Sequence, residues 1–290
     1  MGLGSISACR STELPSLLEE VDAEFIHRKG RVGGLAERFP RLFAAGNLRH
    51  VHVARVEGQV VAAAASQLFT FVDAGRPWRC ARIGAVWTHP SFRGRGLASA
   101  VMRSLVEVHT SERTQALALW TSIHPFYAAL GWRLEDLGLF GTGTSAPTGA
   151  LTEPHRIADC DVKALDRIRK RHLTRFVERE TADWAALPVP ATAVEVFVDE
   201  DAYALVGTVG DAGYVYELTG AQGGLGPVWA MVRARYARVF VNESVGSTAD
   251  WLAQHGGVTF TPQRLSMWMP LAQEAEQLGV KLFVPYLDRI

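Results

Sequence analysis

The chain has 290 residues, of which 48% are hydrophobic and 21% are charged, and its 30 basic and 30 acidic side chains cancel. This is the composition of a globular protein with room for about two domains, and it lacks the basic excess on which nucleic-acid binding usually depends. The longest apolar run, Val60–Ala65, is much shorter than the ~20 residues that cross a bilayer, and the first dozen residues show no secretory signal. We therefore expect neither a nucleic acid nor a membrane as partner.

The three cysteines, Cys9, Cys80 and Cys160, are odd in number and far apart in the sequence. They fit neither a disulfide framework nor a zinc ligand set, so a reducing cytoplasm is the simplest location and no metal is expected. His50 and His52 would share one face of a strand by alternation, but the sequence offers no carboxylate partner for them. We interpret both histidines as structural.

The first half of the sequence predicts helices mixed with antiparallel strands. Apolar residues at helical spacing predict a first helix from Leu14 to Phe25, with Ser11 and Thr12 available as caps. The next elements in chain order are a short helix over 35–43, a hairpin of strands over 51–56 and 59–69, a strand over 82–88, an amphipathic helix over 97–108, a strand over 116–121 and a short helix over 125–130.

A small, polar stretch, Gly141–Gly149, predicts a flexible linker and a domain boundary. The order of strand, glycine-containing segment and helix in residues 83–101 recurs in residues 214–231, which indicates a diverged duplication. The sequence thus predicts two mixed α/β domains, residues 1–143 and 150–290, each a mostly antiparallel sheet flanked by helices. In the second half we expect helices over 162–172, 227–236 and 249–255, and strands over 194–198, 203–209, 214–219, 238–242 and 258–269.

The segment over 86–98 is the one that points to chemistry, because a strand, a glycine-rich loop and the start of an amphipathic helix follow one another there. Amides at a helix start have no intrahelical partner, and the helix dipole adds about half a positive charge, so such a turn binds anions. Gly94 and Gly96 let a phosphate approach the backbone, and Arg93 and Arg95 add charge-assisted donors. The loop has neither the Lys-Ser/Thr pair of a P-loop nor the spacing of a dinucleotide fingerprint.

Two motifs in this half resemble those of a known family. Arg93-x-x-Gly96-x-Ala98, preceded by Val86-x-Thr88-x-Pro90, resembles the pyrophosphate motif of the GNAT N-acetyltransferases, and Phe126-Tyr127-x-x-Leu130-Gly131-Trp132 resembles their aromatic helix. The resemblance covers residues 10–140, and over 39–65 it extends to the tandem subgroup typified by the mycobacterial enhanced-intracellular-survival acetyltransferases. The second half resembles the same fold only by its order of elements. At Gln222-Gly223-Gly224-Leu225-Gly226 it lacks both arginines, so we expect no second cofactor site.

The resemblance implies an N-acetyltransferase made of two tandem GNAT-like domains, with the acetyl-CoA site in residues 1–143 and a diverged domain in residues 150–290. In that family the strand before the loop splays open to pair with pantetheine, and the loop amides hold the pyrophosphate. Tyr127 occupies the position of the family's general acid, and the Val86 amide would polarise the thioester carbonyl. The expected cofactor-binding residues are Val86, Trp87, Thr88, Arg93, Gly94, Arg95, Gly96, Leu97, Ala98 and Ser122.

The general base is not defined by the sequence. Glu24, His27, Asp73 and His124 are all eligible. In the tandem subgroup the chain's own terminal carboxylate reaches into the active site, and here that group would be the carboxylate of Ile290. A water molecule that relays the proton is equally compatible with the sequence.

The sequence does not identify the acceptor substrate either. Aminoglycosides, small polyamines, lysine side chains and peptide N-termini all stay open, as does a homo-oligomer. An acyl-CoA-binding sensor without turnover is the alternative function, because the intact loop fits both and only Tyr127 favours the enzyme. A third reading makes the second half an interaction module that recruits or shapes the acceptor. Glu217, on the strand that corresponds to the cofactor strand, would touch the substrate or merely end a sheet.

Overall fold

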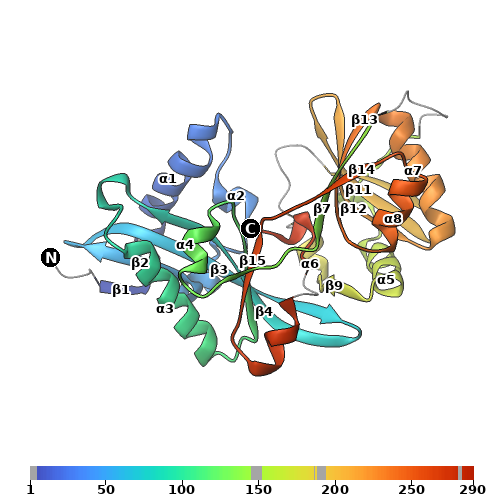
Figure 1. Ribbon diagram of the computed structural model, residues 1–290. Helices are drawn as coiled ribbons and strands as arrows, with labels where there is room; N and C mark the ends of the chain where they lie inside the picture. Colours follow the sequence, from blue (N-terminus) through green and yellow to red (C-terminus); the bar gives the residue numbers. More distant parts are fainter. Residues whose placement is uncertain (1–4, 145–151, 186, 188–193, 280–282) are drawn as a thin grey trace.

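The computed structural model describes residues 5–144, 152–185, 187, 194–279 and 283–290, and it contains two mixed sheets that lie side by side (Figure 1). From edge to edge, the first sheet consists of β1 (Ser5–Ala8), β2 (Val51–Val56), β3 (Gln59–Asp73), β4 (Arg76–Thr88), β5 (Ala116–Trp120), β15 (Ser266–Pro270) and β6 (Arg133–Leu134), with β9 (Arg175–Val177) paired to β3. The second consists of β14 (Thr259–Pro262), β7 (Gly138–Thr144), β13 (Arg238–Ser244), β12 (Ala212–Gly220), β11 (Ala202–Val209), β10 (Glu195–Asp199) and β8 (His155–Arg156).

Helices flank both sheets (Figure 1). None of the helices in the described part of the chain is long and apolar enough to span a membrane. The helices are α1 (Leu14–Phe25), α2 (Leu35–Arg38), α3 (Leu97–Ser111), α4 (His124–Ala128), α5 (Val162–His172), α6 (Thr181–Ala185), α7 (Gln222–Arg235) and α8 (Ser247–Gln254). The predicted fold class, two tandem domains of helices on mostly antiparallel sheets, is confirmed.

The first sheet is buried on both faces, which its sequence explains. The run Ala62–Ala65 in β3 alternates between the faces, so that Ala62 and Ala64 pack in the core beneath α3 while Ala63 and Ala65 pack in the core beneath α1. Because these side chains are small, both helices can approach the same strand closely. The apolar spacing of α1 and α3 supplies the other half of each core.

Each sheet contains a strand that comes from the other half of the sequence. Strand β7 belongs to the first half of the sequence but pairs with β13 and β14 of the second sheet. Strand β15, near the end of the chain, pairs with β5 and β6 of the first sheet (Figure 1). The two sheets therefore do not divide at residues 143–150. Each sheet also contains one parallel pair joined by a helix, β4–α3–β5 and β12–α7–β13, as the duplication predicts.

Several sequence-based boundaries need correction. Residues 141–144 of the expected linker form the end of β7, because their backbone groups pair with β13 and β14, and residues 145–149 lie outside the described part of the chain. The expected strand over 258–269 is two strands that belong to different sheets. Ser11 and Thr12 do not cap α1, which begins after Glu13 without a side-chain cap. Helix α2 is shorter than predicted, and β4 begins earlier.

Candidate active site

A groove of about 620 Å³ runs along the end of β4, the loop after it and the first turn of α3. Most of the residues expected to hold the cofactor form its wall, together with Tyr127 of α4. Arg95 and Ser122 do not line it, although Ser122 is exposed beside Ile123, which does. The described wall residues are Glu24, Phe25, Val86, Trp87, Thr88, Phe92, Arg93, Gly94, Gly96, Leu97, Ala98, Ser99, Ile123, Phe126 and Tyr127.

The groove exists because β4 and β5 diverge. The two strands pair in parallel only from Cys80 to Arg82, and beyond Arg82 the register between them ends. The other edge of β4 stays paired with β3 as far as Thr88, across a bulge in which Ala85 has a φ of +50°. A bulge bends and twists its strand. Beyond Arg82, the backbone N–H and C=O groups on this edge of β4 are consequently not paired with β5 and border the groove instead.

The loop that follows is an open cradle of backbone. Gly94 and Gly96 have φ values of +76° and +75°, and a Cβ added to either would meet no atom within 4 Å. Gly96 begins α3 without a side-chain cap, so the first amides of the helix have no partner inside it. Such a helix start attracts anions. The open cradle, the unpaired strand edge and the mostly apolar wall fit a pantetheine arm and its pyrophosphate.

The two loop arginines are held by contacts within the protein. Arg93 donates from Nε to the Thr88 carbonyl at 3.2 Å and from Nη2 to Glu24 at 3.1 Å. Arg95 donates to the Ser91 carbonyl at 3.3 Å, and its guanidinium lies 4.9 Å from the centre of the Phe92 ring. Both side chains thus tie the loop to its surroundings and keep their charge beside the cradle.

Tyr127 lies on the opposite wall of the groove, in the core beneath α3 and α4. Its ring packs edge to face against Phe126 at 4.8 Å and against Trp132 at 6.3 Å. Burial raises the pKa of Tyr127 to about 12, so the phenol keeps its proton at neutral pH. Its hydroxyl makes no hydrogen bond with any residue that the structure describes. A protonated phenol facing a groove is suited to donate that proton.

The residues eligible as general base are not gathered at the groove. Glu24 lines it, but both of its carboxylate oxygens already accept hydrogen bonds, from Arg28 at 2.5 Å and from Arg93. His27 is exposed in the turn after α1, and Asp73 lies at the far end of β3, ten residues from the part that faces Trp87. His124 is the first residue of α4, and its Nε2 is buried without a described hydrogen-bond partner.

Comparison with known proteins gives a family match for part of the chain. Residues 6–134 match the model of the Acetyltransferase (GNAT) domain. The N-terminal half is a GNAT domain. The match covers the strands, the loop and the aromatic helix of the groove, so the resemblance stated from the two motifs is confirmed. The comparison with curated protein sequences gives no match.

Solved structures share the fold of the whole chain. A GCN5-related N-acetyltransferase from Kribbella flavida has a TM-score of 0.72 at 17% identity over 92% of this chain and 70% of its own. Eis1 from Mycobacterium abscessus has a TM-score of 0.67 at 15% identity, over 93% and 74%. A tandem GNAT protein from the clavulanic acid biosynthesis pathway has a TM-score of 0.57 at 12% identity, over 92% and 98%. The tandem arrangement is therefore shared at the level of the fold.

The last residue of the chain lies against the bulge of the GNAT domain. A Cβ at Gly84 would be 3.2 Å from the carbonyl carbon of Ile290, and the Ile290 side chain packs in the core beneath α1. Asp288 fixes this tail, because it accepts two hydrogen bonds from the buried Arg179, at 2.9 and 2.7 Å. The terminal residue thus lies two positions from Val86 along β4, which makes Ile290 a neighbour of the groove.

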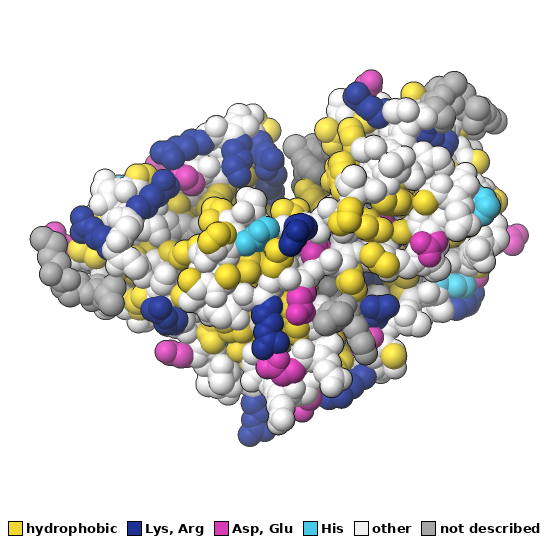
Figure 2. Space-filling view, in the orientation of Figure 1, with side chains coloured by type: hydrophobic (Ala, Val, Ile, Leu, Met, Phe, Trp, Pro, Cys, Tyr) yellow, Lys and Arg dark blue, Asp and Glu magenta, His cyan; other side chains and the backbone are white. Residues whose placement is uncertain are grey.

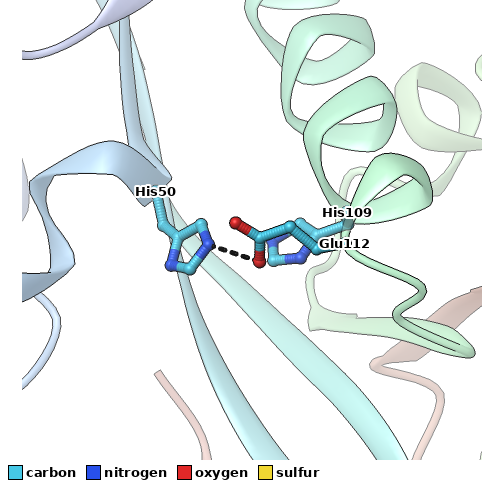
Figure 3. A group of neighbouring side chains, drawn as sticks. All are labelled: His50, His109 and Glu112. Atoms are coloured by element: carbon cyan, nitrogen blue, oxygen red, sulfur yellow. Dashed lines mark hydrogen bonds and ion pairs between the residues drawn. The ribbon is translucent and has the colours of Figure 1, made fainter.

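The two histidines singled out from the sequence belong to separate contacts. His50 Nε2 lies 3.0 Å from Glu112, and its ring stacks on His109 at 5.1 Å (Figure 3). This carboxylate partner is 62 residues away in the sequence and could not be predicted from it, so the statement that His50 has none was wrong. His52 Nδ1 lies 2.8 Å from Ser104.

Although His50, His109 and Glu112 are close enough together to hold a metal ion, their geometry favours a structural role. Both nitrogens of His109 already have partners, Ser66 at 2.7 Å and Thr114 at 3.1 Å. Stacked rings also point their nitrogens along parallel planes instead of toward one point. Burial lowers the pKa of His109 to about 4, so it is neutral at pH 7.

Glu217 neither touches the groove nor ends a sheet. It is buried in β12, where it accepts hydrogen bonds from Arg179 at 2.7 Å and from the Tyr203 hydroxyl. In the second half the segment Gln222–Gly226 is the first turn of α7 and not a loop, and Gly224 packs against Ala202. This differs from the open cradle after β4, because a helix that starts directly after its strand leaves no loop to surround a phosphate.

Proposed function

We propose that the protein is an N-acetyltransferase that moves an acetyl group from acetyl-CoA to a primary amine. The open backbone cradle after the diverging end of β4, with the buried Tyr127 facing it across the groove, carries this proposal. We assign the site to residues 1–143 and assign no cofactor site to the diverged domain of residues 150–290. We also propose a cytoplasmic location, which the three free cysteines support.

The proposed division of labour follows the walls of the groove. The amides from Arg93 to Ala98 would hold the pyrophosphate, with Arg95 and Ser122 at the mouth, and the edge of Val86, Trp87 and Thr88 would pair with the pantetheine arm. Acetyl-CoA supplies the acetyl group: the amine nitrogen bonds to the acetyl carbon as the carbon–sulfur bond breaks, sulfur keeps the electron pair and gains a proton, and the amine loses one.

Three groups of this chain would serve that exchange. The Val86 amide would polarise the carbonyl, because a fixed donor stabilises charge that develops on oxygen. Tyr127 would give its proton to sulfur, since a thiolate near pKa ~8.5 is a poorer leaving group than a thiol. The Ile290 carboxylate, beside Gly84, is our proposed acceptor of the amine proton.

Two measurements on the purified full chain test the proposal. Calorimetry with coenzyme A should give a saturable heat of binding, and thiol release from acetyl-CoA should depend on an added primary amine. Absence of binding would remove the cradle from the argument. Saturable binding without turnover on any amine of a broad panel would favour the alternative, an acyl-CoA-binding sensor.

A further inference from the structure

A second cavity, of about 260 Å³, lies between the two halves of the molecule. Its walls come from the segment after α2, from β3 and β4, and from the segment after β9 together with the C-terminal tail. Figure 2 shows that the boundary between the halves is hollowed, with Lys and Arg side chains gathered on the side of the first half. Ligand sites usually measure about 300–1,000 Å³, so this cavity suits a small molecule.

The cavity lies on the face of β4 opposite the core beneath α3, whereas the groove is lined from both faces at the end of the strand. Ile83 packs in the core beneath α3, in the same cluster as Val86, which lines the groove. Arg82 is the preceding residue of the strand, so its side chain points to the other face. There it lines the cavity.

The two hollows approach each other at the bulge of β4. Gly84 lies against Ile290, which lines the cavity, and Val86 lines the groove two residues further along. The pairing of β5 with β4 ends at Arg82, so none of the described strands continues between the two sides at this point. The cavity and the groove are therefore only two residues apart along β4, at Gly84 and Val86.

The carboxylates of the cavity are already engaged with some of its arginines. Asp183 pairs with Arg41, and Asp288 pairs with Arg179. A third carboxylate, Glu178, lies 3.9 Å from a lysine outside the cavity. Three of the carboxylates that line the cavity are thus already paired with basic side chains, and the Arg41–Asp183 pair connects the two halves.

Three of the cavity's arginines have no carboxylate within 4.0 Å in the described part of the chain: Arg38, Arg82 and Arg289. Arg82 makes a single hydrogen bond with the described residues, from Nη1 to the Asp288 carbonyl. Its Nε is buried without a hydrogen-bond partner. Arg38 makes no hydrogen bond at all with a described residue. Against these three stand two free carboxylates, the side chain of Glu180 and the chain terminus at Ile290, so one positive charge is left over. Buried donors are nearly always satisfied, so an unpaired guanidinium nitrogen here points to an anionic ligand.

We propose that this cavity receives the acceptor, and that the acceptor is a primary amine that also carries an anionic group, a carboxylate or a phosphate, which Arg38 and Arg82 bind. This inference rests on the proposed function. A polycation such as a polyamine would meet uncompensated positive charge in the cavity, whereas an anionic group would supply the missing acceptor for Arg82. The amine at the other end of the acceptor would then lie beside Gly84, two residues from Val86 of the groove.

Thiol release with matched amines tests the preference. The pairs are 4-aminobutyrate against butylamine, O-phosphoethanolamine against ethanolamine, and spermidine as the polycation. We expect kcat/KM at least about 10-fold higher for the anionic member of one pair, because a charge-assisted hydrogen bond contributes about 1.5–3 kcal/mol. A difference within the 4-aminobutyrate pair would identify the anionic group as a carboxylate, and a difference within the O-phosphoethanolamine pair would identify it as a phosphate. Equal or better use of spermidine or of both neutral amines would overturn the proposal.

The variant Arg38→Gln links the preference to the cavity. Arg38 is chosen because Arg82 also holds the tail, so its loss would disturb the fold. Arg38→Gln should lower the anionic-to-neutral ratio of kcat/KM about 10-fold through KM, whereas Arg103→Gln, on the exposed side of α3, should leave it unchanged. An unaltered ratio in Arg38→Gln would also overturn the proposal.

A binding experiment separates this inference from the proposed function. If no amine is acetylated although coenzyme A binds, the proposed reaction fails, and calorimetry with 4-aminobutyrate and O-phosphoethanolamine in the presence of coenzyme A decides the cavity. Binding that is lost in Arg38→Gln supports an anion site there. No heat from either compound contradicts it.

Discussion

Tyr127 shows how one side chain can be both a core residue and a reactive one. Its ring is fixed between Phe126 and Trp132, while its hydroxyl faces the groove. Burial destabilises the phenolate, and this raises the pKa of Tyr127 to about 12. The same packing that anchors the ring therefore keeps the proton on the hydroxyl at neutral pH.

Replacing Tyr127 by phenylalanine should separate these two roles. We expect Tyr127→Phe to lower kcat by about 10²-fold or more, the low end for general acid–base catalysis, with little change in coenzyme A affinity. Because a donor acts in its protonated form, and the pKa of Tyr127 is raised to about 12, this group should cause no loss of kcat between pH 7 and 10.

The matched control is Tyr216→Phe in the second half, whose buried hydroxyl has no described partner, so its removal should leave kcat unchanged. If Tyr127→Phe turned over as fast as the unaltered protein, Tyr127 would have no part in proton transfer.

At the scale of elements, the site depends on a strand, a loop and a helix in that order. The bulge in β4 turns the strand away from β5, and the two glycines with positive φ carry the chain into α3 with its first amides exposed. A side chain other than glycine in this left-handed region costs about 1–3 kcal/mol. The glycines are thus required by the backbone even before a phosphate binds.

The double variant Gly94→Ala with Gly96→Ala tests the cradle. Since an added Cβ meets no atom within 4 Å at either position, the fold should survive with a loss of about 2–6 kcal/mol of unfolding free energy. Coenzyme A affinity should fall at least 10-fold, because two methyl groups would occupy the space of the pyrophosphate. Gly46→Ala is the control, as it has equal space but an ordinary φ. Unchanged affinity in a titration of the double variant would contradict the cradle.

These elements also show what the sequence could predict. Helical apolar spacing marked α1, α3 and α5 almost to the residue, because each buries one continuous stripe. The loop after β4 was predictable for a similar reason, since its glycines and its helix start are local features. Pairing between distant strands was not. Pro262-Gln263-Arg264 interrupts the expected strand over 258–269, but nothing in the sequence shows that the parts on either side enter different sheets.

The same limit applies to the candidate site. Residues of the groove's own strand, loop and helices were identified from motifs, whereas its outer wall, Glu24 and Phe25, comes from α1 and carries no motif. The cationic cavity was missed entirely, because Arg38 and Arg82 become neighbours only when the chain folds. Arginines scattered in a sequence of zero net charge give no sign of a local excess.

At the scale of the whole molecule, exchanged strands join the two halves, and one buried ion cluster anchors the C-terminal tail. Arg169 and Arg179, from the second half of the sequence, meet Glu217 of β12 and Asp288 of the tail. Burial alone would raise the pKa of Asp288, but Arg179, Arg169 and Arg82 outweigh it and hold the pKa below its usual value. The tail is therefore anchored by a charge that stays ionised at neutral pH.

This anchor dictates how the role of Ile290 must be tested. Deleting the last three residues would remove Asp288 as well and leave Arg179 and Arg169 with Glu217 alone; loss of one partner from a buried ion pair typically costs about 3–5 kcal/mol, so lost activity would report unfolding. Deleting Ile290 alone keeps Asp288 and draws the terminal carboxylate back by about 3.5 Å. We expect this variant to keep its melting temperature within a few degrees and its coenzyme A affinity, while kcat falls at least 10²-fold, the low end for a lost general base.

Ile290→Val is the matched control, because it keeps the carboxylate in place and removes only one methylene from the core beneath α1. It should cost about 1 kcal/mol of stability and leave kcat unchanged. Full kcat after deletion of Ile290 would mean that another base, or a water molecule, takes the amine proton. A loss in both variants would instead assign Ile290 to packing, since the side chain and not the carboxylate is what the two changes share.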